Sequence, residues 1–357
     1  MSEVFRQIID RLDLRHAIQN VSCRMLWLQT EQGLIPATLN EKPDQSSYVS
    51  SPYTAYVLYG QNEFEHLNPA KALLLRPLFA ILSLWLKLAA IDRNLTINNW
   101  LFSTNIHPNW TDDSLDSFTS LSTSHPNHAL MIRSLNSVQN ADLIDQLHQR
   151  GWWMLPARQV YLFTAEQALA RKKRNNNQND RRLLRKTHLI HVLPKEHTLR
   201  DFPQMHQVFK KLFIDKHSQY NPQYSADYFW QLHQAGLVEF HSLRDPQSGN
   251  IVGTMGLFSQ HQTVTLPIIG YDTDLPKEWG IYRLLIAKLM GLVEQREQLL
   301  NLSSGAGEFK RQRGGEPVIE YSAVYLNHLP YFRRQLLKSF IRLMQITLPK
   351  AFRHYQV

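Results

Sequence analysis

The chain has 357 residues, of which 43% are hydrophobic and 19% are charged, a globular composition that excludes an intrinsically disordered chain. This length predicts two domains of about 150–180 residues each. The formal charge of +9 favours an anionic partner such as a nucleotide, a phospholipid surface, an acidic carrier protein or a nucleic acid. Because Cys23 is the only cysteine, an intramolecular disulfide and a cysteine-rich zinc site are excluded, and we expect no metal site.

Two segments within the first 90 residues indicate where in the cell the protein is expected. Residues 1–15 contain no apolar signal core, so we expect a cytoplasmic protein. The apolar run 77–86 is flanked by Arg76 and Lys87 and is shorter than the roughly 20 residues that a membrane-spanning helix needs. We therefore interpret residues 70–90 as a buried helix rather than as one that dips into a membrane.

Strand and helix patterns alternate in residues 1–170, which is typical of an α/β domain. The predicted strands lie at 53–59, 95–102, 128–133 and 159–163, and the predicted helices at 67–90, 115–122 and 138–150. The following segment, 171–186, is rich in Asn, Arg and Lys and has no apolar period. We interpret it as an exposed linker, and nucleic-acid binding is disfavoured because no aromatic residues are interleaved with its charges.

Residues 187–330 follow a more regular order of one strand, two helices, three antiparallel strands, a long helix and two strands. The strands are predicted at 189–193, 238–244, 251–258, 263–270, 299–303 and 317–326, and the helices at 198–216, 225–236 and 279–298. The sequence DPQSGN at 245–250 has the composition of a hairpin turn. A long helix that begins just after a strand places its N-terminal N–H groups beside the sheet, where such groups can bind a pyrophosphate.

This order, together with LLNLSSGAGEFKRQRGGEP at 299–317, resembles the GNAT acyltransferases, and in particular the double-domain group of FemAB-like and CelD/BioF-like proteins. The resemblance covers about residues 190–330. It implies an α/β fold of two GNAT-like domains with mixed, mainly antiparallel sheets flanked by helices, namely a degenerate domain at 1–170 and an acyltransferase domain at 187–330. The Gly-rich signature that usually precedes the long helix is reduced here to Gly280 in LPKEWGIYR.

The resemblance implies an enzyme that transfers an acyl group directly to an amine or hydroxyl acceptor with the help of a general base. The donor would be a thioester, either acyl-CoA or an acyl carrier protein, and no tightly bound cofactor is expected. Two alternatives stay open. One is a Fem-type ligase that takes an aminoacyl group from tRNA, which the lack of a sustained heptad disfavours. The other is a non-catalytic adaptor with the GNAT shape.

Candidate site residues follow from the same resemblance. The catalytic candidates are Asp272, Glu308 and Tyr325. The donor-binding candidates are Ile268, Ile269, Gly270, Gly280, Ile281, Tyr282, Arg283, Lys310 and Arg313. The acceptor-binding candidates lie at the joint between the two helices and are Ser218, Tyr220 and Tyr224. Simpler structural roles also fit, since Asp272 could be a turn acid, Tyr325 a core tyrosine and the joint an ordinary connection.

The C-terminal segment 331–357 is predicted to be a basic amphipathic helix. Leu336, Phe340, Leu343 and Ile346 recur at helical spacing, and the segment contains no acidic residue. Such a helix either packs on the sheet with a solvated basic edge, or docks on an anionic membrane or an acidic carrier protein.

Overall fold

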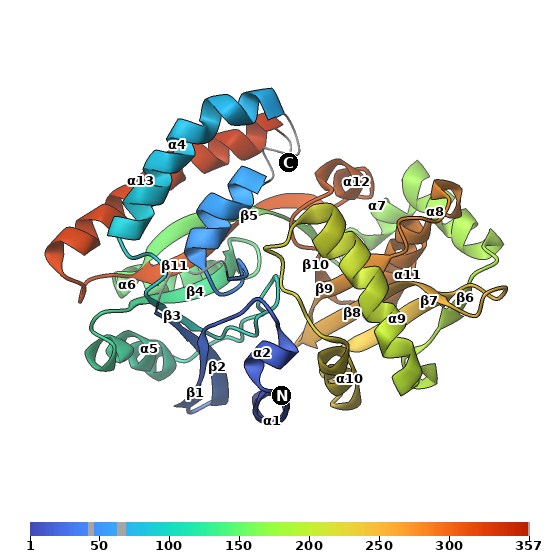
Figure 1. The fold of residues 1–357 in the computed structure, drawn as a ribbon, viewed down its shortest axis with the longest axis horizontal. Helices are drawn as coiled ribbons and strands as arrows, with labels where there is room; N and C mark the ends of the chain where they lie inside the picture. The colour runs from blue at the N-terminus through green and yellow to red at the C-terminus, as the bar shows by residue number, and fades with distance from the viewer. Residues whose placement is uncertain (42–45, 63–68, 356–357) are drawn as a thin grey trace.

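The computed structural model describes residues 1–41, 46–62 and 69–355, with the backbone alone described at 69–74 and 353–355. Within the described chain, an 11-stranded sheet runs through both halves of the molecule (Figure 1), in the order β1-β2-β3-β4-β11-β5-β10-β9-β8-β7-β6. Among its strand pairs, only β3–β4 and β9–β10 are parallel in the described residues. The predicted α/β architecture with mainly antiparallel strands is thereby confirmed.

The N-terminal half contributes these elements: α1 (Ser2–Leu12), α2 (Leu14–Ala17), β1 (Arg24–Thr30), β2 (Gly33–Asn40), η1 (Thr54–Leu58), α4 (Pro69–Leu88), β3 (Asn94–Ile97), α5 (Asp112–Ser124), β4 (Ala129–Asn136), α6 (Ala141–Gln149) and β5 (Trp153–Phe163). The C-terminal half contributes α7 (Ala168–Lys172), α8 (Asn175–Lys186), β6 (Ile190–Val192), η2 (Pro194–Glu196), η3 (Leu199–Asp201), α9 (Phe202–Phe209), η4 (Lys210–His217), α10 (Ala226–Gln234), β7 (Glu239–Arg244), β8 (Ile251–Gln260), β9 (Thr263–Tyr271), η5 (Lys277–Trp279), α11 (Ile281–Gln295), β10 (Leu299–Asn301), α12 (Gly307–Gln312), β11 (Glu316–Tyr325) and α13 (Tyr331–Tyr355).

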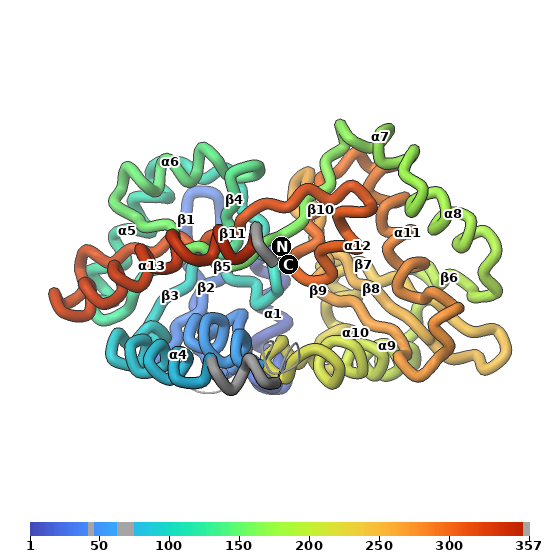
Figure 2. The backbone as a smooth tube through the Cα atoms, turned by 90° about the horizontal axis from the view of Figure 1, so that it is seen from above, coloured from blue at the N-terminus to red at the C-terminus, as the bar shows by residue number. Residues whose placement is uncertain are grey.

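The two halves repeat one strand arrangement and exchange their last strands. β1, β2 and β3 form an antiparallel meander followed by the parallel strand β4, and β7, β8 and β9 form a meander followed by the parallel strand β10. β11, from the end of the second half, lies between β4 and β5, and β5 pairs with β10. Residues 316–325 therefore belong to the sheet of the N-terminal half. In Figure 2 the orange β11 crosses to join the green β5 near the middle of the molecule.

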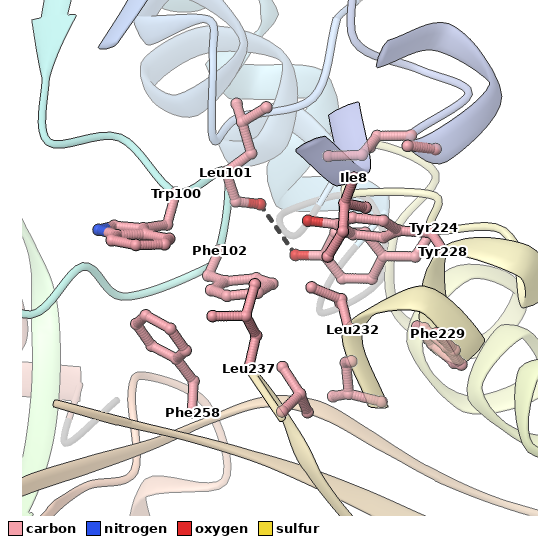
Figure 3. Close-up of a cluster of buried hydrophobic side chains, with 14 of the residues drawn as sticks. Ile8, Trp100, Leu101, Phe102, Tyr224, Tyr228, Phe229, Leu232, Leu237 and Phe258 are labelled. Atoms are coloured by element: carbon pink, nitrogen blue, oxygen red, sulfur yellow. Dashed lines mark hydrogen bonds between the residues drawn. The ribbon is translucent and has the colours of Figure 1, made fainter. Parts of the chain in front are cut away.

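A shared hydrophobic core also joins the halves. Trp100 and Phe102 from the N-terminal half contact Phe258 from β8, with ring centroids 5.2 and 5.0 Å apart. The hydroxyl of Tyr224 donates a hydrogen bond to the carbonyl of Leu101 at 2.9 Å (Figure 3). Large aromatic side chains buried in this way stabilise the contact between the halves.

Tertiary contacts override local pattern in two segments. Residues 53–59, which we expected to form a strand, form the helical segment η1, because the carboxylate of Asp92 accepts a hydrogen bond from the N–H of Tyr53 and the hydroxyl of Ser51 accepts one from the N–H of Thr54. Residues 175–186 form the helix α8 rather than a linker. Leu183 and Leu184 of α8 pack on the core of the C-terminal half. The other contacts that hold this helix are made by polar side chains, so its sequence shows no apolar period.

The helix α4 differs from its predicted buried form because much of its apolar surface is exposed. Leu78, Ile81, Leu84 and Leu88 each keep about 60% of their surface accessible, whereas Leu86 is fully buried. The helix α13 packs beside α4, with Leu337, Phe340 and Ile341 buried below it. Across the described residues, no helix is both long enough and apolar enough to cross a membrane.

Candidate functional site

The parallel strands β9 and β10 separate partway along their length. Their parallel pairing ends at Thr265 and Asn301. Beyond these residues β9 continues to Tyr271, whereas the segment that follows β10 no longer pairs with it. Ile268 and Ile269 lie on the diverging part of β9, but they point to opposite faces and are buried in separate hydrophobic clusters. A Cβ atom at Gly270 would lie 2.3 Å from Cα of Phe209, so this glycine serves the close packing of α9.

The N-terminus of α11, where donor phosphates were expected, is covered by α8. Gly280 has φ 62° and begins α11, and a Cβ atom there would lie 2.7 Å from Cδ2 of Leu183 on α8. Ile281 is buried in the core of the C-terminal half. Tyr282 contacts Phe309 with ring centroids 5.0 Å apart, and burial raises the pKa of this tyrosine to about 12. Side chains therefore fill the space between α11 and α12.

The two arginines predicted to bind phosphate hold α8 instead. Nε of Arg283 lies 2.7 Å and Nε of Arg313 lies 2.6 Å from the carboxylate oxygens of Asp180, which is 3% exposed. The guanidinium of Arg313 also lies 3.4 Å from the ring centre of Phe309. Asp180 thus pairs with both of the cations that a donor phosphate would meet at this end of α11.

Lys310 fixes a turn rather than offering a free ammonium. Its Nζ donates hydrogen bonds to the carbonyls of Leu302, Ser303 and Ser304 at 2.7, 3.2 and 2.8 Å, and Ser303 has a positive φ of 56°. Burial, and then the guanidinium of Arg158, lower the pKa of Lys310 to about 7. All three donors of the ammonium are used, so this lysine shapes the chain where it leaves β10.

The three catalytic candidates do not come together. Asp272 follows the far end of β9, roughly 20 Å along the strand from Thr265, and pairs with Lys211 at 2.6 Å. Glu308 is exposed on α12 and accepts a hydrogen bond from Gln312 at 3.0 Å. Tyr325 lies at the end of β11 opposite Leu130, in the core of the N-terminal half. The strand exchange carries Tyr325 into the other half, away from Asp272 and Glu308.

The acceptor candidates lie in a loop that joins the two halves. Ser218 is buried, and its hydroxyl accepts a hydrogen bond from the N–H of Tyr220 at 3.3 Å. The carbonyl of Tyr220 accepts hydrogen bonds from the hydroxyl of Ser47 and the N–H of Tyr48 in the N-terminal half. Tyr224 is a core residue, 1% exposed. This loop therefore has a structural role at the interface between the halves.

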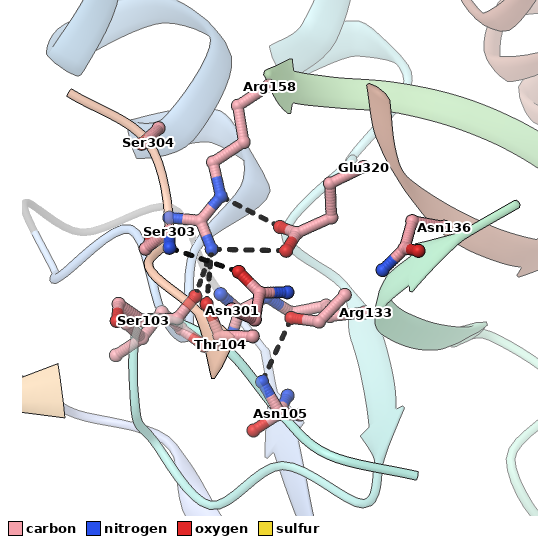
Figure 4. Close-up of polar contacts among 12 residues, drawn as sticks. Ser103, Thr104, Asn105, Arg133, Asn136, Arg158, Asn301, Ser303, Ser304 and Glu320 are labelled. Carbon is pink, nitrogen blue, oxygen red and sulfur yellow. Dashed lines mark hydrogen bonds and ion pairs between the residues drawn. The ribbon is translucent and has the colours of Figure 1, made fainter. Parts of the chain in front are cut away.

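At the centre of the sheet lies a polar and charged group that we call the junction cluster, comprising Arg133, Arg158, Asn301, Lys310 and Glu320. Figure 4 labels all of its members except Lys310, and Lys310 is the only member that the sequence had indicated. Nε of Arg158 lies 2.7 Å from Oε1 of Glu320, and Nη2 lies 3.1 Å from the hydroxyl of Thr104. Glu320 is only 3% exposed. Although burial disfavours its charge, the Glu320 carboxylate raises the pKa of Arg158. The sequence signal that could have revealed this cluster is the presence of single charged residues within otherwise apolar strands.

Arg133 of the junction cluster has no carboxylate partner within ion-pair distance among the described residues. Its Nη1 donates hydrogen bonds to the carbonyl of Val49 at 2.8 Å and to Oδ1 of Asn99 at 3.1 Å, and it remains partly exposed. Burial, and then the charge of Arg158, lower the pKa of Arg133. Apart from Lys310, whose donors are used by three carbonyls, the cluster thus contains two guanidinium groups but a single carboxylate, and it is suited to stabilising a negative charge.

A small polar pocket of about 40 Å³ lies where the halves meet, lined by residues of both. Asn105, His107 and Ser134 face it from the N-terminal half, and Thr263 and Asn301 from the C-terminal half. This volume suits one or two water molecules rather than a substrate.

Within the described chain, no three His, Cys, Asp or Glu side chains are grouped to hold a metal ion.

His107 makes the junction sensitive to acid. Its Nδ1 accepts a hydrogen bond from Asn98 at 2.9 Å and its Nε2 donates one to the carbonyl of Arg133, and burial lowers its pKa to about 4. Between pH 6.5 and 4 the unfolded chain therefore binds a proton that the folded chain does not, so stability is lost as the pH falls. We expect His107→Gln to reduce this acid loss by up to about 3 kcal/mol.

Unfolding in urea at pH 7, 6, 5 and 4.5 measures this effect, and the exposed His16 provides the control His16→Gln. The difference in unfolding free energy between wild type and His107→Gln should shrink or reverse towards low pH. A difference that is the same at every pH would show that folding does not lower the pKa of His107.

No protein-family model and no curated protein matches the sequence. Among solved structures, L-PGS from Bacillus licheniformis is similar with a TM-score of 0.50 and 13% identity, over 70% of this chain and 82% of that chain. The C-terminal domain of a protein described as a lysylphosphatidylglycerol synthetase, from Agrobacterium fabrum, has a TM-score of 0.49 and 13% identity, over 69% and 81% of the two chains. FemX has a TM-score of 0.46 and 10% identity, over 59% and 75%. The similarity to L-PGS is one of fold alone, and the two repeated halves agree with the arrangement of two GNAT-like domains that the strand order predicts.

Proposed function

We propose that the chain is a transferase that moves an acyl or aminoacyl group from an activated donor to an amine or hydroxyl acceptor, with the reaction at the junction cluster. The observation that carries this proposal is the excess of positive charge in the interior, directly where β10 ends and the chain parts from β9. Fixed cations at such a place stabilise the oxyanion that forms when the acceptor attacks the carbonyl carbon.

For a thioester donor, the acceptor nitrogen or oxygen forms a bond to the carbonyl carbon and the carbon–sulfur bond breaks. The proton lost by the acceptor ends on the thiolate, so the products are the acylated acceptor and a free thiol. In this scheme the guanidinium of Arg133 donates hydrogen bonds to the oxyanion, because its Nε and Nη2 make no hydrogen bond within the described residues. Lys310 acts as a positioning residue through the turn that it holds.

The donor we propose is acyl-CoA or an acyl carrier protein, with its pantetheine arm between β9 and the turn after Asn301. Its phosphates would approach the N-terminus of α11, where Leu183 and Asp180 now lie. Binding of such a donor therefore requires α8 to move. A second candidate donor is an aminoacyl group carried on RNA, which is favoured by the exposed cations beside this position, namely Lys173, Arg174, Arg182, Arg185 and Lys186.

The proposed function is tested with purified full-length chain, supplied in turn with acetyl-CoA, a long-chain acyl-CoA, an acyl carrier protein and an aminoacyl-tRNA, using a mixture of amine and hydroxyl acceptors. With the productive donor, Arg133→Gln should lower kcat/KM by about 100- to 1,000-fold, as expected for loss of one oxyanion donor. The control Arg24→Gln removes an exposed cation from β1. If no donor binds or reacts, the proposal fails, and equal kcat/KM for both variants would exclude Arg133 from the reaction.

Truncating Leu183 should expose the N-terminus of α11. We expect Leu183→Ala to bind the CoA donor several-fold more tightly than wild type, because the side chain over Gly280 is shortened. Leu184→Ala is the matched control, since Leu184 also packs on the same core. Calorimetric titration with acetyl-CoA measures both affinities, and weaker binding by Leu183→Ala would place the donor phosphates elsewhere.

A further inference from the structure

The exposed large hydrophobic side chains of this protein are concentrated on two neighbouring helices. Within the described residues, eight of the fourteen lie on α4 and α13 (Leu78, Ile81, Leu84, Leu88, Tyr331, Phe332, Leu343 and Ile346). We call these eight residues, with the exposed cations among them, the α4–α13 face. Single exposed apolar residues are normal on a protein surface, but a group of this size on one face indicates a binding surface.

The face on α4 is apolar along the length of the described helix. Leu78, Ile81, Leu84 and Leu88 are spaced by three or four residues and so share one side, and they are 60%, 64%, 61% and 60% exposed. The other exposed residues described on α4 are also apolar or cationic, namely Arg76, Pro77, Ala80 and Lys87. The exposed side of this helix therefore carries no acidic and no neutral polar side chain between residues 75 and 88.

The helix α13 extends the face. It runs alongside α4 in Figure 1, and Nε1 of Trp85 on α4 donates a hydrogen bond to the carbonyl of Leu336 at 3.2 Å. Phe332 and Ile346 are 67% and 59% exposed, and Arg342 and Lys350 are exposed as well. Neither helix contains an Asp or Glu in its sequence.

We propose that the α4–α13 face binds an anionic lipid surface, with its leucine and isoleucine side chains inserted at the level of the headgroups and its cations paired with lipid phosphates. The charge decides between the candidate occupants. A second copy of the chain would bring two acid-free, cationic faces together, which is repulsive, whereas an anionic bilayer supplies both the opposite charge and an apolar layer. In this arrangement both helices lie parallel to the bilayer.

Three cations of α13 contact other parts of the protein and are unsuitable for testing this face. Arg333 donates hydrogen bonds to the carbonyls of Ala89, Ala90, Arg93 and Asn127, so it holds the end of α4 in place. Lys338 and Arg342 lie 4.9 and 5.3 Å from the ring centre of Trp153. Substitutions at these positions would perturb folding as well as any lipid contact.

Flotation of the full-length chain with vesicles tests the proposal. Wild type should float with vesicles of phosphatidylglycerol and phosphatidylcholine, and less with phosphatidylcholine alone. Ile81→Gln with Leu84→Gln should lower the bound fraction on anionic vesicles at least tenfold, while Leu193→Gln with Leu199→Gln, which changes two exposed leucines elsewhere, should not. Glutamine is a good helix former, so α4 should persist.

A second pair of variants tests the charge. Arg76→Glu with Lys350→Glu should weaken binding to anionic vesicles, and added salt should weaken the binding of wild type. The matched control, Arg182→Glu with Arg185→Glu, removes two exposed cations from α8. Absence of wild type from the floated fraction would overturn the proposal, as would equal flotation of all variants. Light scattering that shows a dimer lost only in Ile81→Gln with Leu84→Gln would assign the face to self-association instead.

Discussion

Replacing Arg158 by methionine is expected to lower the free energy of unfolding by about 3–5 kcal/mol. The guanidinium of Arg158 pairs with Glu320 at 2.7 Å, and Glu320 is only 3% exposed, so the substitution leaves a carboxylate charged and unpaired in the interior. Chemical denaturation of the variant and of wild type at pH 7 measures the loss.

The double variant Arg158→Met with Glu320→Met should recover most of that stability, because two apolar side chains of similar size replace a desolvated ion pair. The control Arg150→Met removes an arginine whose partners, Asp112 and Asp116, are 76% and 66% exposed, and should cost about 1 kcal/mol or less. A double variant no more stable than the single variant would show that Arg158 is held by packing and not by the carboxylate.

Replacing Gly270 by alanine is expected to cost about 3 kcal/mol or more, at or above the upper end of the usual range for overpacking. A Cβ atom there would lie 2.3 Å from Cα and 2.4 Å from N of Phe209 and 2.6 Å from the carbonyl carbon of Val208. These are backbone atoms of a buried helix, so no side-chain rotation relieves the clash. The reduced stability should appear in denaturation without any donor present, as expected for a packing role.

Gly291→Ala in α11 is the matched control for Gly270→Ala. Nothing lies within 4 Å of a Cβ atom at residue 291, and alanine is favoured over glycine in a helix by about 1 kcal/mol. This variant should therefore be as stable as wild type or more so. If Gly270→Ala unfolded at the wild-type urea concentration but lost affinity for the donor, Gly270 would belong to the donor site after all.

The elements that the sequence alone determined are those specified by neighbouring residues. The hairpin between β7 and β8 is an example, because its turn is closed by contacts from Asp245 to Gln247 and Ser248 within the segment itself. The helix α11 and the meander of β7, β8 and β9 also follow from local periodicity, and with them the GNAT-like order. The first strands, β1 and β2, were missed because no alternation marks residues 24–40 clearly.

Only the tertiary structure decided which distant segments meet. Alternation predicts a strand at residues 317–326, but it contains no information on the partner of that strand. The exchange of β11 into the other half follows from its pairing with β4 and β5. The ion pair of Arg158 with Glu320 joins positions 162 apart. The burial of Asp180 between Arg283 and Arg313 likewise turned an expected linker into a helix that covers the expected donor site. Local patterns specify the type of each element, whereas pairing, burial and charge compensation depend on residues far apart in the chain, and the candidate site is built from those.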